Sequence, residues 1–128
     1  MIVNDPATLA EVEAIFARYE AALVGNDVAV LDELFWQDER TIRYGIGENL
    51  HGVSEILAFR KGRSPAGLAR DLDRTVITTF GTDFAIASTL FRREGAKGRV
   101  GRQMQSWVRM EDGWRVVAAH VSIIDETA

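Results

Sequence analysis

Two long segments at the C-terminal end of the chain, residues 99–110 and 114–124, constrain the fold more than any other feature of the sequence. Apolar and polar residues alternate in both segments, which is typical of strands with one buried face. Between them, the residues Glu111-Asp112-Gly113 favour a turn. The sequence therefore predicts a long β-hairpin that is half buried.

The two faces of this hairpin differ in chemistry. In the second segment, alternation predicts a mixed face of Trp114, Val116, Ala118, His120 and Ser122 and an apolar face of Val117, Ala119, Val121 and Ile123. A face that carries uncharged hydrogen-bonding groups opposite the packing face is typical of a polar pocket wall. Because Gln103, Gln105 and Trp107 share a face in the first segment, we predict five substrate-binding residues in the hairpin. These are His120, Gln105, Ser122, Gln103 and Trp107.

The first part of the chain predicts helices. Asp5-Pro6 is a favourable helix start, with aspartate as the cap and proline at the first helical position. The buried stripe of this helix is predicted to consist of Leu9, Val12, Phe16, Tyr19 and Leu23. Gly25-Asn26 ends it, and Asp27 begins a second helix. The buried side of the second helix is predicted to be Val30, Leu31, Leu34 and Phe35.

Strands follow the helices. The sequence predicts a short strand over residues 41–44, a glycine-rich loop over 45–52 and a third helix over 54–60. Strands over 70–80 and 84–93 then lead into the C-terminal hairpin as an antiparallel meander. Because the helices come early and the long strands late, we predict an α+β fold with helices packed on one face of a curved antiparallel sheet.

Composition excludes several classes of protein. The length of 128 residues fits a single domain, residues 1–128, and the absence of cysteine excludes disulfides, thiolate metal sites and cysteine nucleophiles. The net charge of -4 argues against a nucleic-acid partner. No apolar stretch of membrane-spanning length and no signal-peptide pattern is present, so we expect a cytoplasmic protein that does not bind membranes.

Arginine dominates the basic residues. Of the 15 lysines and arginines, only Lys61 and Lys97 are lysines. One interpretation is the codon usage of a GC-rich genome. Another is that some arginines bind a carboxylate, since a guanidinium group makes paired hydrogen bonds that lysine cannot make. The two interpretations are compatible.

Several segments resemble known families. Three segments resemble the nuclear transport factor two-like superfamily, also called SnoaL-like. They are NDVAVLDELF (residues 26–35), GVSEI (52–56) and WRVVAAHVS (114–122). More narrowly, the chain is similar to the AtzH-like family in RYGIGEN (43–49), TFG (79–81) and GRQ (101–103). Members of that family accompany amidases in the catabolism of oxalurate and of ureas derived from cyanuric acid. The resemblance spans nearly the whole chain.

The resemblance implies a cone, in which a curved antiparallel sheet wraps around three N-terminal helices and leaves a pocket at its open end, usually in a homodimer. It also implies removal of a carboxyl group from an N-carboxylated urea, for example 1,3-dicarboxyurea to allophanate. The superfamily also contains isomerases, cyclases, dehydratases, epoxide hydrolases and association domains, so the fold alone leaves the chemistry open.

We therefore expect a metal-independent hydrolase that acts on carbon-nitrogen bonds of a small anionic substrate, without a cofactor. Its expected partners are a second copy of the chain and, functionally, an amidase. The alternative is a non-catalytic domain that binds a small anion or associates with an amidase.

Tyr19 and Arg43 are the predicted catalytic residues. The hydroxyl of Tyr19, on the buried stripe of the first helix, either meets a backbone group in the core or points at a ligand. Arg43, in the short strand before the glycine-rich loop, is either a surface residue or a clamp for a substrate carboxylate. Together, a phenol and a guanidinium group can polarise a carbonyl and transfer a proton without a metal.

The remaining polar residues give weaker signals. Arg70 is a predicted substrate-binding residue and Arg102 a further cationic candidate, although solvated strand ends explain both equally well. His120 is either a structural hydrogen-bonding residue or part of the pocket wall, and His51 is expected to be solvated. The two histidines lack the spacing of metal ligands, so no metal site is predicted. The chain also lacks the Gly-x-Ser-x-Gly elbow of a serine hydrolase.

Overall fold

The structure is a computed structural model that describes residues 1–126. This part of the chain contains three helices, α1 (Pro6–Val24), α2 (Val28–Leu34) and α3 (Val53–Gly62). The predicted caps are present, since the carboxylate of Asp5 accepts a hydrogen bond from the backbone N–H of Thr8 over 3.1 Å. Asp27 likewise accepts from the backbone N–H of Val30 over 3.2 Å. Helix α3 is longer than predicted at both ends.

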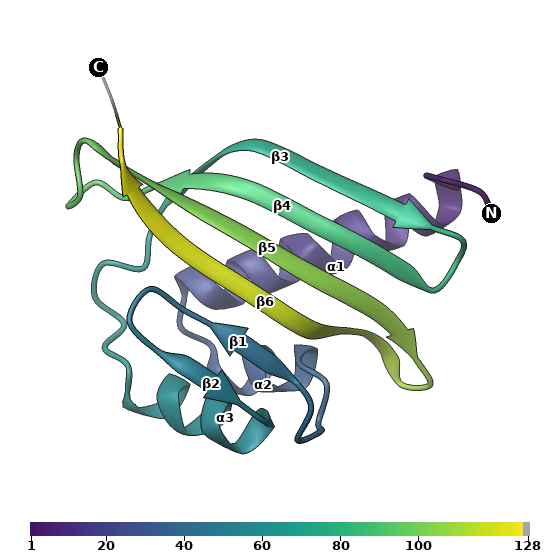
Figure 1. The fold of residues 1–128 in the computed structure, drawn as a ribbon, viewed down its shortest axis with the longest axis horizontal. Coiled ribbons are helices and arrows are strands. Elements are labelled where there is room, and N and C mark those ends of the chain that lie inside the picture. The colour runs from purple at the N-terminus through teal and green to yellow at the C-terminus, as the bar shows by residue number, and fades with distance from the viewer. Residues whose placement is uncertain (127–128) are drawn as a thin grey trace.

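The strands form one six-stranded sheet in the order β2-β1-β6-β5-β4-β3 (Figure 1). Their bounds are β1 (Ile42–Tyr44), β2 (Asn49–His51), β3 (Asp71–Phe80), β4 (Phe84–Arg92), β5 (Arg99–Met110) and β6 (Gly113–Asp125). Strands β3 to β6 are the predicted antiparallel meander. Strand β1 pairs with β6 in parallel, with Arg43 opposite Ala119, so the sheet is mostly rather than wholly antiparallel.

Strand β2 was missed by the sequence pattern, which predicted only a loop over residues 45–52. The backbone N–H of Gly45 donates to the carbonyl of Glu48 over 2.9 Å and closes a hairpin turn between β1 and β2. Three residues are too few to display an alternating pattern, and the flanking glycines favour a loop. This turn folds Glu48 back toward Arg43, with which it forms an ion pair.

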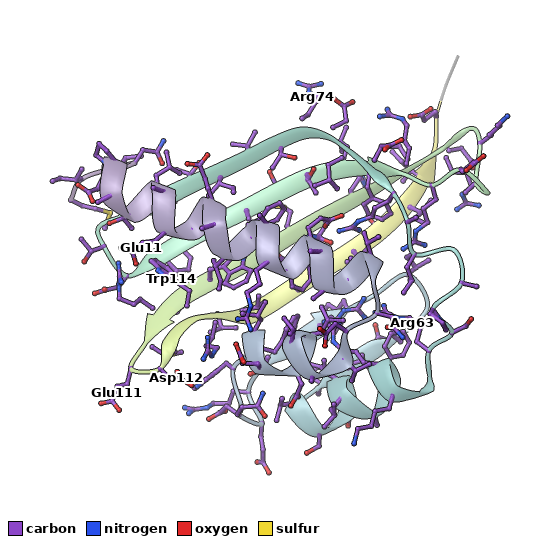
Figure 2. All side chains as sticks on the ribbon, turned by 180° about the vertical axis from the view of Figure 1, so that it is seen from behind. Glu11, Arg63, Arg74, Glu111, Asp112 and Trp114 are labelled. Carbon is purple, nitrogen blue, oxygen red and sulfur yellow. The ribbon has the colours of Figure 1, made fainter. Side chains whose placement is uncertain are left out.

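Helix α1 lies across one face of the curved sheet, which we call the inner face (Figures 1 and 2). Helices α2 and α3 lie beside the edge formed by β1 and β2 (Figure 1). The aromatic members of the core are Phe16, Tyr19, Phe35, Trp107 and Trp114. The predicted stripes of α1 and α2 are buried as expected, except that Leu9 and Val30 are only half buried. None of the helices in the described part of the chain has the length and apolar character needed to cross a membrane.

A β-bulge interrupts the C-terminal hairpin. Ser106 pairs with Ala118, but the next residue of β5, Trp107, pairs with Val116. Val117 is therefore an extra residue in β6, and the alternation of side chains changes phase at this point. Trp107 and Val116 face the core on one side of the bulge. The simple alternation assumed from the sequence holds only up to the bulge.

The bulge makes two sequence predictions wrong. Beyond it, Ala119 and Val121 pair with Gln105 and Gln103 and are buried on the inner face, so they take the face that the sequence pattern assigned to His120 and Ser122. His120 and Ser122 lie on the outer face instead. They cannot share a pocket wall with the two glutamines, because adjacent residues of a strand point to opposite faces.

Candidate functional site

A cavity of about 130 Å³ lies between α1, α3 and the inner face of the sheet. It is found near the C-terminal end of α1, at the opposite end of that helix from the Glu11–Trp114 contact labelled in Figure 2. Its lining consists of Tyr19, Leu23, Arg43, Ile46, Glu48, Phe59, Arg63, Leu68, Arg70, Arg93, Gln103 and Val121. Among residues 1–126, this lining contains four arginines and a single carboxylate, that of Glu48.

The structure brings some of the predicted site residues together and separates others. Four of them line the cavity, namely Tyr19, Arg43, Arg70 and Gln103. Two more are fully buried behind the lining, where the indole N–H of Trp107 donates to the side-chain oxygen of Gln105 over 3.1 Å. His120, Ser122 and Arg102 lie on the outer face of the sheet, outside the cavity.

Tyr19 is held rigidly where α1 passes the cavity. Its ring packs edge-on against Trp107, with the ring centroids 6.2 Å apart, and is tilted against Phe35 at 6.3 Å. Burial by itself raises the pKa of the phenol, but the positive charges of Arg60 and Arg43 and then of Arg70 outweigh it. The pKa of Tyr19 therefore lies below its usual value, which makes the hydroxyl a better proton donor than that of a free tyrosine.

Arg43 is oriented by the β1–β2 turn. Its Nη1 donates to Oε1 of Glu48 over 2.8 Å, and the backbone N–H of Gly47 donates to Oε2 of the same carboxylate over 3.1 Å. Gly45 leaves room for this ion pair, because a Cβ atom there would overlap the Glu48 carboxylate. The glycines that the sequence pattern assigned to a loop thus position an ion pair on the cavity wall.

Arg70 is anchored on the other side of the cavity. It donates to both carboxylate oxygens of Glu20 over 2.9 and 2.6 Å, and to the side-chain oxygen of Gln103 over 3.0 Å. Its guanidinium carbon lies 4.4 Å from the centroid of the Phe91 ring. A Cβ atom on Gly101 would overlap that ring, so glycine at this position of β5 leaves the space that Phe91 occupies.

Three arginines near the cavity have buried nitrogens without a partner among the described residues. In Arg60 all three side-chain nitrogens are unpaired, in Arg63 Nε and Nη2, and in Arg93 Nε. Burial lowers the pKa of all three guanidinium groups. For Arg63, burial and then the positive charges of Arg60 and Arg43 lower the pKa to about 10. A buried charge without a partner is costly. The unpaired donors of Arg63 and Arg93, which line the cavity, therefore favour an anion there.

The sequence pattern missed these three arginines. Arg60 and Arg63 belong to the last turn and the C-terminal cap of α3, and Arg93 follows the end of β4. The excess of arginine over lysine was the only sequence signal for them, and a composition does not show which arginines line a cavity. The amide nitrogen of Gln103 on the cavity wall is also buried and unpaired in the described structure, which adds an uncharged donor. Within residues 1–126, no group of three or more histidine, aspartate or glutamate side chains is placed to hold a metal ion.

A curved sheet with a helix across its inner face and a polar cavity at one end of that helix defines the nuclear transport factor two-like class of folds. A structure of such a protein, of unknown function and from Pseudomonas putida, has a TM-score of 0.78 at 19% identity and covers 91% of this chain and 86% of its own. More narrowly, the chain belongs to the AtzH-like family, whose model matches residues 1–127.

Two solved structures are much more similar. A protein of unknown function from Pectobacterium atrosepticum is 63% identical over 96% of this chain and 95% of its own, with a TM-score of 0.94. A cystatin-like fold protein from Burkholderia xenovorans is 49% identical over 99% of both chains, with a TM-score of 0.95. A comparison with curated proteins gives no match.

Proposed function

We propose that this protein removes a carboxyl group from an N-carboxylated urea or a related amide, such as 1,3-dicarboxyurea, and so yields allophanate. The observation that carries the proposal is the excess of positive charge around the cavity. Four arginines line the cavity, and within residues 1–126 only the carboxylates of Glu20 and Glu48 pair with them. A cavity of about 130 Å³ suits a small anion, because pockets for drug-sized ligands span roughly 300–1,000 Å³.

The chemistry of such a substrate requires a proton donor. When carbon dioxide leaves, the bond between nitrogen and the carboxylate carbon breaks, and its electron pair stays on nitrogen. The nitrogen then takes up one proton, so that the dicarboxyurea dianion and a proton give allophanate and carbon dioxide. In this proposal Tyr19 supplies the proton, which is supported by its position on the cavity lining and by its lowered pKa.

Arg43 supplies the electrostatic part of the proposed reaction. Its guanidinium group lines the same cavity as Tyr19, and Glu48 holds it in one orientation. A fixed positive charge next to the carboxylate that leaves also stabilises charge that develops on the oxygens during bond cleavage. Hydrolysis, in which water attacks the same carboxyl carbon and releases bicarbonate, would use the two residues in equivalent roles.

The test is to supply the protein with carboxylated ureas generated in place by an amidase, and to follow carbon dioxide, bicarbonate, ammonia and the urea products against a protein-free blank. We expect faster release of carbon dioxide or bicarbonate and faster formation of the product with one carboxyl group, without extra ammonia. Extra ammonia would mean cleavage of a different carbon-nitrogen bond and would contradict the proposal. Membrane-inlet mass spectrometry distinguishes the two reactions. Decarboxylation releases carbon dioxide at once, whereas hydrolysis releases bicarbonate first and carbon dioxide appears with a delay.

The same charge excess supports a second function, the binding of a small anion without turnover in a domain that partners an amidase. Saturable binding of a carboxylated urea with no change in its rate of breakdown would favour this function. A change in the amidase's own rate when this protein is added, retained in the Tyr19→Phe variant, would favour it further.

A further inference from the structure

We propose that the cavity is a clamp with two ends for a dianion, in which Arg63 binds one anionic group and Arg93 binds the other. For the identity of the substrate we rely on the proposed function. The clamp itself requires only that two unpaired cationic groups are held apart in one cavity. Neither arginine pairs with a carboxylate of the described chain, whereas Arg43 and Arg70 do.

One end of the clamp is built on Phe59 of α3. The guanidinium carbons of Arg43 and Arg63 lie 5.3 and 5.5 Å from the centroid of this one ring. Arg43 is neutralised by Glu48. Arg63, labelled in Figure 2 beside the segment that leads from α3 to β3, keeps two buried N–H groups without a partner in the described structure. The aromatic face holds this second guanidinium in place without cancelling its charge.

The other end repeats this arrangement on Phe91 of β4. The guanidinium carbons of Arg70 and Arg93 lie 4.4 and 5.2 Å from the centroid of that ring. Arg70 is neutralised by Glu20, whereas Nε of Arg93 is buried and has no partner in residues 1–126. Each end therefore combines a phenylalanine, one paired arginine and one unpaired arginine.

The sheet topology keeps the two ends apart. Arg43 comes from β1 and Phe91 from β4, and strands β6 and β5 lie between them. Neighbouring strands are about 4.8 Å apart, so the two backbones are separated by roughly 14 Å and only long side chains reach inward from both. Val121 of β6 and Gln103 of β5 form the wall between the ends. The unpaired amide nitrogen of Gln103 offers a hydrogen bond to a group in the middle of the ligand.

The clamp therefore fits a short molecule with an anionic group at each end and an acceptor such as a carbonyl oxygen between them. In the proposed reaction, only one end carries out chemistry. The end with Arg43 and Arg63 holds the carboxylate that leaves, because Glu48 fixes the orientation of Arg43 on the wall of the cavity that Tyr19 also lines. The end with Arg93 retains the second carboxylate, which makes Arg93 a residue for specificity rather than for the chemical step.

The experiment is isothermal titration of the protein with unreactive carboxylates of similar length, namely malonate, succinate and glutarate against acetate and butyrate. We expect at least one dicarboxylate to bind about tenfold or more tightly than both monocarboxylates. In Arg93→Gln and in Arg63→Gln, this preference should fall to within about twofold. Equal binding of the two classes by the parent protein, or an unchanged preference in both variants, would overturn the proposal.

Arg102→Gln is the matched control, because Arg102 is the neighbour of Gln103 in β5 and lies on the opposite face of the sheet. It makes the same change of charge outside the cavity and should leave the preference intact. Arg93 is half buried and its buried Nε has no partner in the described residues, so Arg93→Gln should keep a melting temperature close to that of the parent. If that variant nevertheless unfolds, Arg93→Lys keeps the charge but not the planar group and should show a reduced preference.

Turnover gives an independent readout. With a dicarboxylated urea, Arg93→Gln should raise KM about tenfold while kcat stays within about twofold, whereas an equal loss in kcat would place Arg93 in the chemical step and overturn its role as a specificity residue. The titrations need no turnover. A protein that prefers dicarboxylates but has no activity would leave the clamp standing and remove only the proposed function.

Discussion

Arg43 donates from Nη1 to Oε1 of Glu48 over 2.8 Å, so one nitrogen of the predicted carboxylate clamp is already bound by a carboxylate of the protein itself. The pair is almost wholly shielded on the arginine side, where the side chain is 7% exposed, and is more open at Glu48, at 22%. Glu48 therefore fixes the orientation of Arg43 and cancels one positive charge of the cavity.

Removing the charge of Glu48 should strengthen anion binding. In Glu48→Gln, the side chain keeps its shape and one hydrogen-bond acceptor while the cavity gains one net positive charge. We expect the Kd of a small dicarboxylate to fall roughly tenfold at low salt, equivalent to about 1.4 kcal/mol. Titration of parent and variant at matched ionic strength measures this effect. Weaker binding in the variant would mean that the orientation of Arg43 matters more than its free charge.

Arg43→Lys tests whether geometry or charge is needed at this position. Lysine keeps the positive charge but has neither the planar group that Phe59 supports nor the paired hydrogen bonds of a guanidinium. We expect loss of most activity on a carboxylated urea, with a melting temperature close to that of the parent. Activity within about twofold of the parent at unchanged stability would place Arg43 outside the reaction.

Tyr19→Phe separates a core role of this residue from a chemical one. If Tyr19 only packs in the core, loss of its hydroxyl should cost about 1 kcal/mol of stability and leave the rate unchanged. If the hydroxyl transfers a proton, turnover should fall roughly a hundredfold while the fold stays intact. We expect the second result. Paired melting curves and rates decide the question, and a lower melting point with a normal rate would return Tyr19 to a purely structural role.

The pH dependence of the rate should report the lowered pKa of Tyr19. A proton donor is lost as the pH rises through its pKa, and this pKa lies below the usual value of about 10 for tyrosine. The alkaline fall in kcat/KM should therefore begin below pH 10. Arg60→Gln removes a positive charge that lowers the pKa of Tyr19, so it should move this fall to higher pH. A fall that stays in place in a folded Arg60→Gln variant would assign it to another group.

We expect a homodimer that forms through the outer face of the sheet. The apolar face of Val117, Ala119, Val121 and Ile123 cannot supply this contact, because Ala119 and Val121 are buried inside. Directly paired residues instead form a row across the outer face: Val76, Ser88, Met104, His120 and Tyr44. Val76 and Met104 are 56% and 55% exposed and lie on either side of Ser88 in this row, so together they present an apolar surface to a second copy.

Sedimentation at micromolar concentration tests the dimer. The parent protein should sediment as twice the chain mass, and Met104→Glu should sediment as a 14.2 kDa species because it places a charge in the contact. Met104→Leu, which keeps the apolar surface, serves as the control. A parent protein that sediments only at 14.2 kDa would rule out the dimer at this concentration.

Much of the fold could be predicted from local patterns. The caps at Asp5 and Asp27, the buried stripe of the first helix and the alternation in the long strands each depend on residues close together in the chain. Helix and strand periods are local properties, so they can be recognised without knowledge of the partners. Tyr19 could be selected as a candidate because it lies on that stripe, and Arg43 because it precedes the glycine-rich turn.

The composition of the cavity depended on tertiary structure for two reasons. Val117 is an extra residue only because of how β6 pairs with β5. As a result of that pairing, Val121 faces the cavity and His120 lies on the outer face. Arg63 and Arg93 lie 30 positions apart in the sequence and have no local feature that distinguishes them from exposed arginines. Their unpaired charge arises from enclosure by helices and strands that are distant in the chain. The sequence by itself determined the elements and the excess of arginine, whereas packing decided which arginines would be buried without a partner.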